Sequence, residues 1–131
     1  MMTEVLDAMT RVLHGMFPQA HIFLEEARQG VRDGDFVVGL NSFSTREIHG
    51  GVTHCRAEFF VERYQKTPDF AVLAVFPDLF GVLPLKSGIF LRGHLSECTR
   101  KGERFALKVR YEYYLQNAEE ALPMEELELK N

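Results

Sequence analysis

The sequence predicts an α+β fold, in which a mostly antiparallel sheet of about five strands carries two helices on one face. The first segment has apolar residues at three- and four-residue spacing, whereas most of the next hundred residues alternate with period two, which is typical of strands. A second apolar segment, long enough for a helix, separates three predicted strands from a final pair joined by a short turn. This order, α-β-β-β-α-β-β, favours antiparallel pairing.

The first helix is expected between Thr3, which can cap its start, and Pro18, which ends it. Glu4, Asp7 and Arg11 lie on its polar face, and the opposite face must pack against the sheet. That apolar face consists of Val5, Leu6, Met9, Val12, Leu13 and Met16.

Three strands are expected next. Residues 21–25 form a short strand, and the glycines within residues 29–35 indicate a turn. Residues 36–40 are densely apolar, which predicts a central strand buried on both faces, and residues 41–51 are expected to form a polar loop. Residues 52–62 alternate cleanly, so this strand has one apolar and one charged face.

A second helix is expected over residues 69–83, and it should be bent or in two pieces because Pro77 disrupts a helix interior. Residues 89–98 predict another strand, and residues 99–102 predict a hairpin turn. The last long strand contains Phe105 and again divides into an apolar and a charged face.

Composition and charge predict one globular domain over residues 1–131. Of its 131 residues, 46% are hydrophobic and 26% are charged, as in soluble proteins. The formal net charge of -4 arises in residues 119–131, which hold five glutamates and one lysine, so the chain has a neutral body and an acidic tail at 117–131. A chain without a basic stripe is not expected to bind nucleic acid.

The sequence also predicts a compartment. No apolar stretch approaches the roughly 20 residues of a membrane span, and the N-terminus lacks the basic start of a secretory signal. We therefore expect a cytoplasmic site of synthesis, no membrane partner and two reduced cysteines, Cys55 and Cys98.

No residue pattern points to a cofactor, a metal or catalysis. His54 and Cys55 are adjacent in a strand, so they project to opposite faces and cannot both bind one ion. The glycine-containing turns match no phosphate-binding motif. One alternative from another class stays open, a small cytoplasmic enzyme or ligand-binding module in which Cys98, close to basic residues, acts with His94 as a thiol site.

The charged faces of the two long strands are the candidate interaction surface. A solvated sheet face explains their charges equally well, but Phe60 and Tyr114 stand among them, and aromatics interleaved with arginine are typical of interfaces. Exposed residues of the predicted loop extend the candidate surface. The candidate residues are Phe43, Arg46, Glu47, Arg56, Glu58, Glu62, Lys108, Arg110 and Glu112.

Several short motifs together resemble one family. The first helix ends in LHGMFP at 13–18, and the first strand runs into EEARQG at 25–30. An apolar FVV follows, and LRG at 91–93, the strand of Tyr111 and PMEELE at 123–128 stand further on. This pattern resembles the tail terminator proteins of phages and prophages of Gram-positive bacteria. The chain departs from it at Gly34, where proline is usual, and in the strand where Thr53, His54 and Cys55 stand.

The resemblance implies a structural role without catalysis. Tail terminators form a ring, generally a hexamer, on the last ring of the tail tube, where they stop tube polymerisation and offer a surface to the head connector. In contractile or headless tail-like particles, the ring would close the top of the tube and touch the sheath. Such a ring needs a lateral interface that closes by rotation and an axial face for the tube.

The resemblance therefore implies the chain itself, the tail tube protein, and sheath or head-connector proteins as partners. The protein would be found in the host cytoplasm during assembly and then in a contractile or non-contractile tail. A head-completion or adaptor subunit of the same particle stays open as the nearest alternative, because function lies in surfaces rather than in folds.

Overall fold

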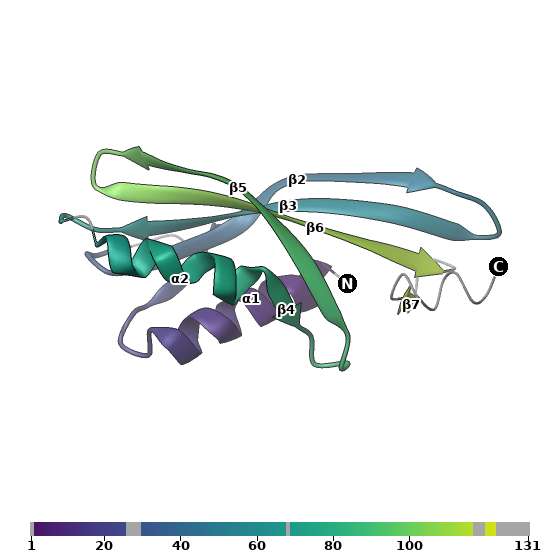
Figure 1. Ribbon diagram of the computed structural model, residues 1–131, viewed down its shortest axis with the longest axis horizontal. Helices are drawn as coiled ribbons and strands as arrows, with labels where there is room; N and C mark the ends of the chain where they lie inside the picture. Colours follow the sequence, from purple (N-terminus) through teal and green to yellow (C-terminus); the bar gives the residue numbers. More distant parts are fainter. Residues whose placement is uncertain (1, 26–29, 68, 117–119, 123–131) are drawn as a thin grey trace.

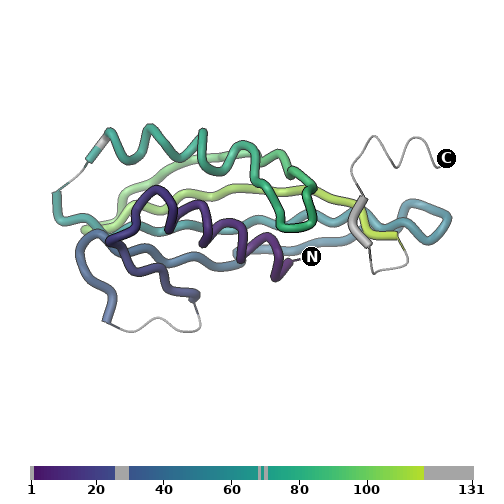
Figure 2. The backbone as a smooth tube through the Cα atoms, turned by 90° about the horizontal axis from the view of Figure 1, so that it is seen from below, coloured from purple at the N-terminus to yellow at the C-terminus, as the bar shows by residue number. Residues whose placement is uncertain are grey.

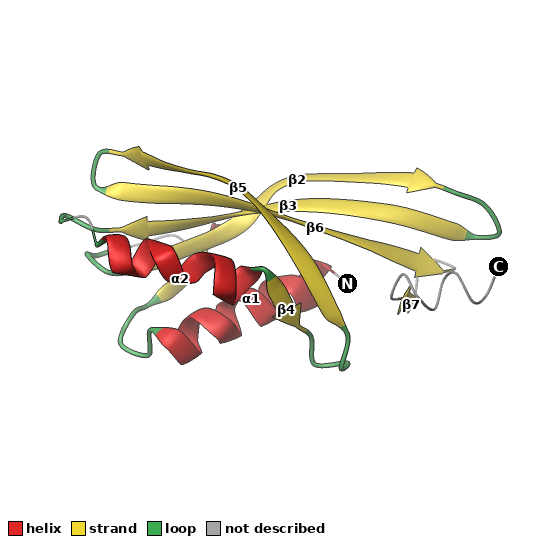
Figure 3. Ribbon diagram, in the orientation of Figure 1, coloured by secondary structure: helices red, strands yellow, loops and turns green. Residues whose placement is uncertain are grey.

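Two helices lie against the same face of a twisted sheet in the computed structural model (Figures 1 and 3). The structure describes residues 2–25, 30–67, 69–116 and 120–122. This arrangement confirms the predicted α+β class with both helices on one side. The elements are α1 (Met2–Met16), β1 (Ile22–Leu24), β2 (Phe36–Glu47), β3 (Val52–Tyr64), α2 (Phe70–Phe80), β4 (Val82–Pro84), β5 (Phe90–Lys101), β6 (Arg104–Gln116) and β7 (Glu120–Leu122).

The sheet has the strand order β1-β2-β3-β6-β5-β4, and β7 pairs with β6. All pairs are antiparallel except β1 with β2, which run parallel. The five predicted strands are present, and the structure adds β4 and β7, each three residues long. Strand β7 falls within the expected acidic tail, of which 117–119 and 123–131 lie outside the described residues.

The expected loop at 41–51 is wrong, because β2 continues to Glu47. Its register with β3 shifts between Leu40 and Ser42, so Asn41 is an extra residue in the strand. After this bulge, pairing with β3 resumes residue by residue through Glu47. The segment is polar because residues 41–47 are all exposed, while backbone pairing with β3 keeps them extended.

Both helices differ from prediction at one point. Thr3 lies inside α1 and does not cap it. Helix α2 is one piece with Pro77 inside it and not two, and it ends at Phe80 because Leu83 belongs to β4. Asp69 caps its start by accepting a hydrogen bond from the Ala71 backbone N–H at 3.1 Å. The Pro77 carbonyl accepts the Gly81 N–H at 2.9 Å, so the turn that follows the proline is closed.

The hydrophobic core lies between the helices and the inner face of the sheet. Helix α1 buries Val5, Ala8, Met9 and Leu13, four residues in its three- and four-residue pattern. In β2, Phe36, Val37 and Val38 are all fully buried, which confirms burial on both faces of this segment. The largest fully buried core side chains from the other elements are Phe59, Phe80, Leu83, Val61, Val109 and Tyr111.

A crowded junction joins β5, β6 and the end of α2. Strand β5 begins by pairing with β4 at Phe90–Arg92. From Gly93, which lies opposite Tyr111, it pairs with β6 instead. A Cβ at Gly93 would overlap the Phe80 carbonyl oxygen and the Tyr111 ring, so the close approach needs glycine. The buried Tyr111 hydroxyl donates to that same Phe80 carbonyl at 2.8 Å, and the Gly93 N–H donates to the Gly81 carbonyl at 2.9 Å.

The β2–β3 hairpin extends past the helices at one end of the molecule (Figures 1 and 2). Its turn, residues 48–51, includes Gly50 and Gly51 at φ values of 62° and 77°, which glycine adopts without strain. Among the described residues, no helix is both long and apolar enough to cross a membrane.

We expect Tyr111→Phe to lower the free energy of unfolding by about 1 to 3 kcal/mol, because it leaves the buried Phe80 carbonyl without its donor. Urea unfolding followed by circular dichroism measures the change. Tyr114→Phe on the opposite face is the matched control and should change stability by less than ~0.5 kcal/mol. Equal midpoints for both variants would contradict the role given to the Tyr111 hydroxyl.

Candidate functional site

The outward side chains of β3 and β6 form a charged face on the side of the sheet away from the helices. Arg56 pairs directly with Glu112, and Glu58 pairs with Arg110, so opposite charges stand side by side across the two strands. Lys108 lies opposite Phe60, further along the same face. Six of the candidate residues therefore share one surface, as alternation predicts: Arg56, Glu58, Glu62, Lys108, Arg110 and Glu112.

Most of these charges have partners within the chain. Glu112 contacts His54 at 3.2 Å and Arg110 at 3.5 Å, and the Asn41 amide donates to Glu58 at 2.6 Å. Side chains at the centre of this network are about one-third exposed, as with 32% for both Arg110 and Glu112. The charged face is thus electrically balanced and wet, and exposed pairs of this kind contribute little to stability.

Glu62 differs from the other candidate residues because its side chain is only 9% exposed. Its carboxylate forms an ion pair with Arg104 at 2.9 Å. A hydrogen bond with the Tyr64 side chain, and then the Glu62 charge, raise the pKa of the Arg104 guanidinium. Glu62 is therefore part of the structural support of this face and is poorly placed to contact a partner.

Phe43, Arg46 and Glu47 do not form one surface with each other. Arg46 pairs with His54 and lies on the charged face, whereas Phe43 pairs with Ala57 and Glu47 with Thr53 on the helix side. Phe43 is 41% exposed there.

The aromatic residues of the charged face are packed rather than fully exposed. Phe60 covers Gly39 so closely that a Cβ at position 39 would overlap its ring. The Tyr114 ring lies 5.2 Å from the His54 ring. Each aromatic ring packs on a residue of the neighbouring strand, and these cross-strand contacts account for the aromatics among the charges.

The thiol alternative loses its geometric basis. Cys98 pairs with Leu107 on the helix side, while His94 pairs with Arg110 on the charged face. Partial desolvation raises the pKa of the exposed Cys98 thiol, and burial raises the pKa of the Cys55 thiol, so neither is activated as a thiolate. Within the described ranges, no three His, Cys, Asp or Glu side chains are grouped so as to hold a metal ion.

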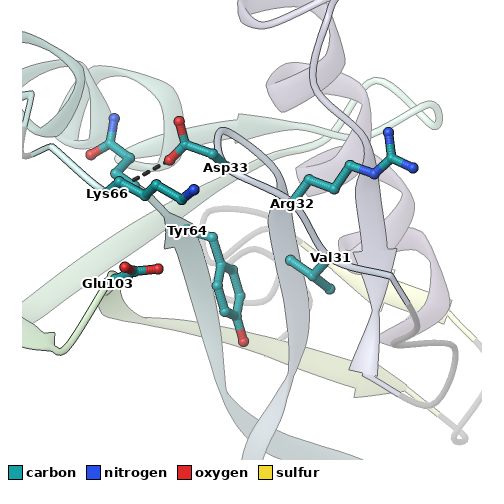
Figure 4. Close-up of a pocket in the computed structure, with 7 residues that line it drawn as sticks. Val31, Arg32, Asp33, Tyr64, Lys66 and Glu103 are labelled. Atoms are coloured by element: carbon teal, nitrogen blue, oxygen red, sulfur yellow. Dashed lines mark hydrogen bonds between the residues drawn. The ribbon is translucent and has the colours of Figure 1, made fainter.

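Two cavities at the end opposite the β2–β3 hairpin were not predicted. The first, about 420 Å³, lies between the loop before β2 and the end of β3, and Arg32 extends away from the group around Asp33 and Tyr64 (Figure 4). The Lys66 backbone N–H donates to Asp33 at 2.7 Å, which ties the two segments together. The residues lining it are Val31, Arg32, Asp33, Tyr64, Gln65, Lys66 and Glu103.

The second cavity, about 390 Å³, is bordered by Arg63. The Arg63 guanidinium lies over the rings of Phe17 and Phe36, 4.6 and 4.8 Å from their centroids. Its Nε and Nη1 are buried without a hydrogen-bond acceptor among the described residues, and burial lowers the pKa of this group although Asp69 and Asp33 oppose the shift. The ring contacts stabilise the cation in place of hydrogen bonds. One signal was present in the sequence, since position 63 continues the apolar alternation of β3 with a cation.

The chain matches no protein-family model and no curated protein.

The burial of Glu62 predicts that its charge matters more for stability than the charge of a more exposed glutamate on the same face. We expect Glu62→Gln to lower the free energy of unfolding by about 1 to 3 kcal/mol, because the 2.9 Å contact with Arg104 loses its carboxylate charge at a side chain that is only 9% exposed. Glu58→Gln makes the same chemical change at a more exposed position and should cost less than ~1 kcal/mol. Chemical unfolding of both variants measures the difference, and equal losses would show that burial does not distinguish the two carboxylates.

Proposed function

We propose that the protein is a ring-forming subunit that closes the end of a phage tail tube, or of the tube of a tail-like particle. The family resemblance carries the proposal, and its motif residues support the fold at specific places. Gly93 of the LRG motif occupies the crowded junction, and Tyr111 donates the buried hydrogen bond there. Phe17 of the LHGMFP motif contacts Arg63 and Phe36. Three of the resembling residues, Phe17, Gly93 and Tyr111, therefore make packing contacts within this chain.

The shape of the molecule supports an assembly role. Helices cover one face of the sheet, the other face is wet and balanced in charge, and the β2–β3 hairpin reaches beyond the helices (Figure 1). The hairpin carries two exposed apolar side chains, Phe43 and Ile48, each 41% exposed. Ile48 lies in the turn, and an exposed apolar side chain at the tip of a projecting hairpin is suited to a protein partner.

The ring would act by geometry and not by chemistry. Identical subunits related by rotation close on themselves, which leaves one axial side for the last ring of tube and the other for the head connector, collar or sheath. Growth of the tube stops because the terminator presents a second surface that does not accept another tube subunit. The hairpin tip is the element that we assign to the axial contact with the tube.

The defining experiment mixes the purified protein with the tail tube protein of the same phage or prophage. Electron microscopy should show rings on tube ends, and tubes grown in its presence should be shorter. A protein that stays monomeric and leaves tube lengths unchanged would refute the proposal. Binding to a head connector without binding to tubes would favour the adaptor alternative.

The hairpin tip provides a variant for the same assay. Ile48→Asp should raise the protein concentration needed to cap tubes by about tenfold or more, because burial of an isoleucine side chain contributes about 1.5 to 3 kcal/mol. Met16→Asp, which changes a 49% exposed side chain at the end of α1, should leave capping unchanged. Equal capping by the two variants would remove Ile48 from the tube contact.

A further inference from the structure

Two long stretches of strand edge are left without a partner among the described residues. Strand β1 pairs with β2 only at Phe36–Val38, so the edge of β2 from Gly39 to Glu47 is open. Strand β4 pairs with β5 only at Phe90–Arg92, and beyond Gly93 the outer edge of β5 is open to Lys101. Open strand edges present unpaired N–H and C=O groups that readily accept another strand.

These edges lie on opposite sides of the sheet, so they are not equivalent surfaces. The four long strands follow the order β2-β3-β6-β5, and each adjacent pair is antiparallel. Strands β2 and β5 therefore run in opposite directions. A second copy in a similar orientation would present its β2 antiparallel to β5 of the first copy, and the alternation would continue without interruption.

We propose that the open edge of β2 pairs with the open edge of β5 of a second copy of this chain. In the antiparallel register that we assign, Phe43 lies opposite Cys98 and Ser42 opposite Thr99, while Ser44–Glu47 run beside the part of β5 that precedes Cys98 and contains its register shift. The pairing uses both open edges of every copy and is head-to-tail, as a closed ring requires. This inference rests on the proposed ring and names its lateral contact.

The faces of the two edges match. Phe43 pairs with the buried Ala57, and Cys98 pairs with the buried Leu107, so both side chains lie on the helix side of the sheet. Phe43 and Cys98 are both exposed in the single chain. Pairing of the edges would bring the two side chains into contact and cover an exposed aromatic ring.

The register implies a displacement between copies. Cys98 pairs with Leu107, Leu107 with Val61, and Val61 with Val38. Cys98 and Val38 of one copy therefore lie at the same position along the strands. Phe43 pairs with Ala57, four residues from Val61, so a copy whose Phe43 faces Cys98 is displaced by four positions along the strands. Displacement of this kind is what closure of a sheet requires, because strands in a closed barrel are tilted and staggered. The helices then lie on one surface of the continuous sheet, and the charged faces of all copies lie on the other, toward a water-filled opening.

Cysteine cross-linking tests the proposal with the native Cys98. In Phe43→Cys, a short bismaleimide should join neighbouring copies through Cys98 and give a ladder of multimers on denaturing gels. Ser44→Cys is the matched control, because Ser44 pairs with Arg56 and faces the opposite side. We expect about tenfold less cross-linked product from it, since adjacent residues of a strand project to opposite faces. Adding Cys98→Ser should abolish the ladder.

Glu47→Cys lies on the same face as Phe43, four residues or about 13 Å further along the strand, so a bismaleimide with a correspondingly longer spacer keeps the test valid if Phe43 itself is needed for association. Urea unfolding of each variant confirms that it is folded. Dimers of Phe43→Cys that persist with Cys98→Ser would indicate symmetric pairing of two β2 edges and would overturn the proposal. Mass photometry, which detects rings in solution, separates failure of the edge pairing from failure of the proposed function. Rings without cross-links at either position overturn the edge pairing alone, whereas cross-linked ladders without tube capping overturn the proposed function alone.

Discussion

The arrangement of the chain depends on the contact among Tyr111, Phe80 and Gly93. One carbonyl accepts a buried hydroxyl from β6, and the same carbonyl leaves no room for a side chain on β5. The end of α2 and the path of β5 are therefore fixed together. Beyond this point β5 turns away to β4, and the edge of β6 that it vacates is taken by β7 at Tyr114–Gln116.

Successive side chains of β3 and β6 point alternately into the hydrophobic core and toward solvent. Ala57, Phe59 and Val109 are fully buried on the helix side, while Arg110 and Glu112, at the alternate positions of β6, form an ion pair on the wet face. A shift of register by one residue would bury the charges and expose the core, so pairing between these strands is strongly specified. Because positive and negative charges balance on the outer face, this face does not preferentially attract a positively or a negatively charged partner.

Periodic segments were the predictable part of this fold. Helix α1 and the strands β3 and β6 carry strong patterns, because each divides core from solvent along its whole length. The far half of β2 has no such pattern, since both of its faces are exposed and its structure comes from pairing with β3. Strands β4 and β7 are too short for any period, and the position of Arg63 between Phe17 and Phe36 depends on contacts distant in sequence. The candidate surface was predictable for the same reason as β3 and β6, whereas its internal ion pairs and the burial of Glu62 depend on exact cross-strand neighbours.

The open edges carry features that discourage random association without removing the capacity to pair. Both edges contain a register irregularity, and β5 ends in Arg100 and Lys101, which repel the like edge of another copy. Beyond the Asn41 bulge, however, β2 is regular for six residues and carries an exposed aromatic ring. These features disfavour pairing of an edge with its own copy. They leave pairing between the unlike β2 and β5 edges possible, which favours one orientation of assembly. In the proposed ring, two such unlike edges would join copies head to tail, and growth would end when rotation brings the last open edge back to the first.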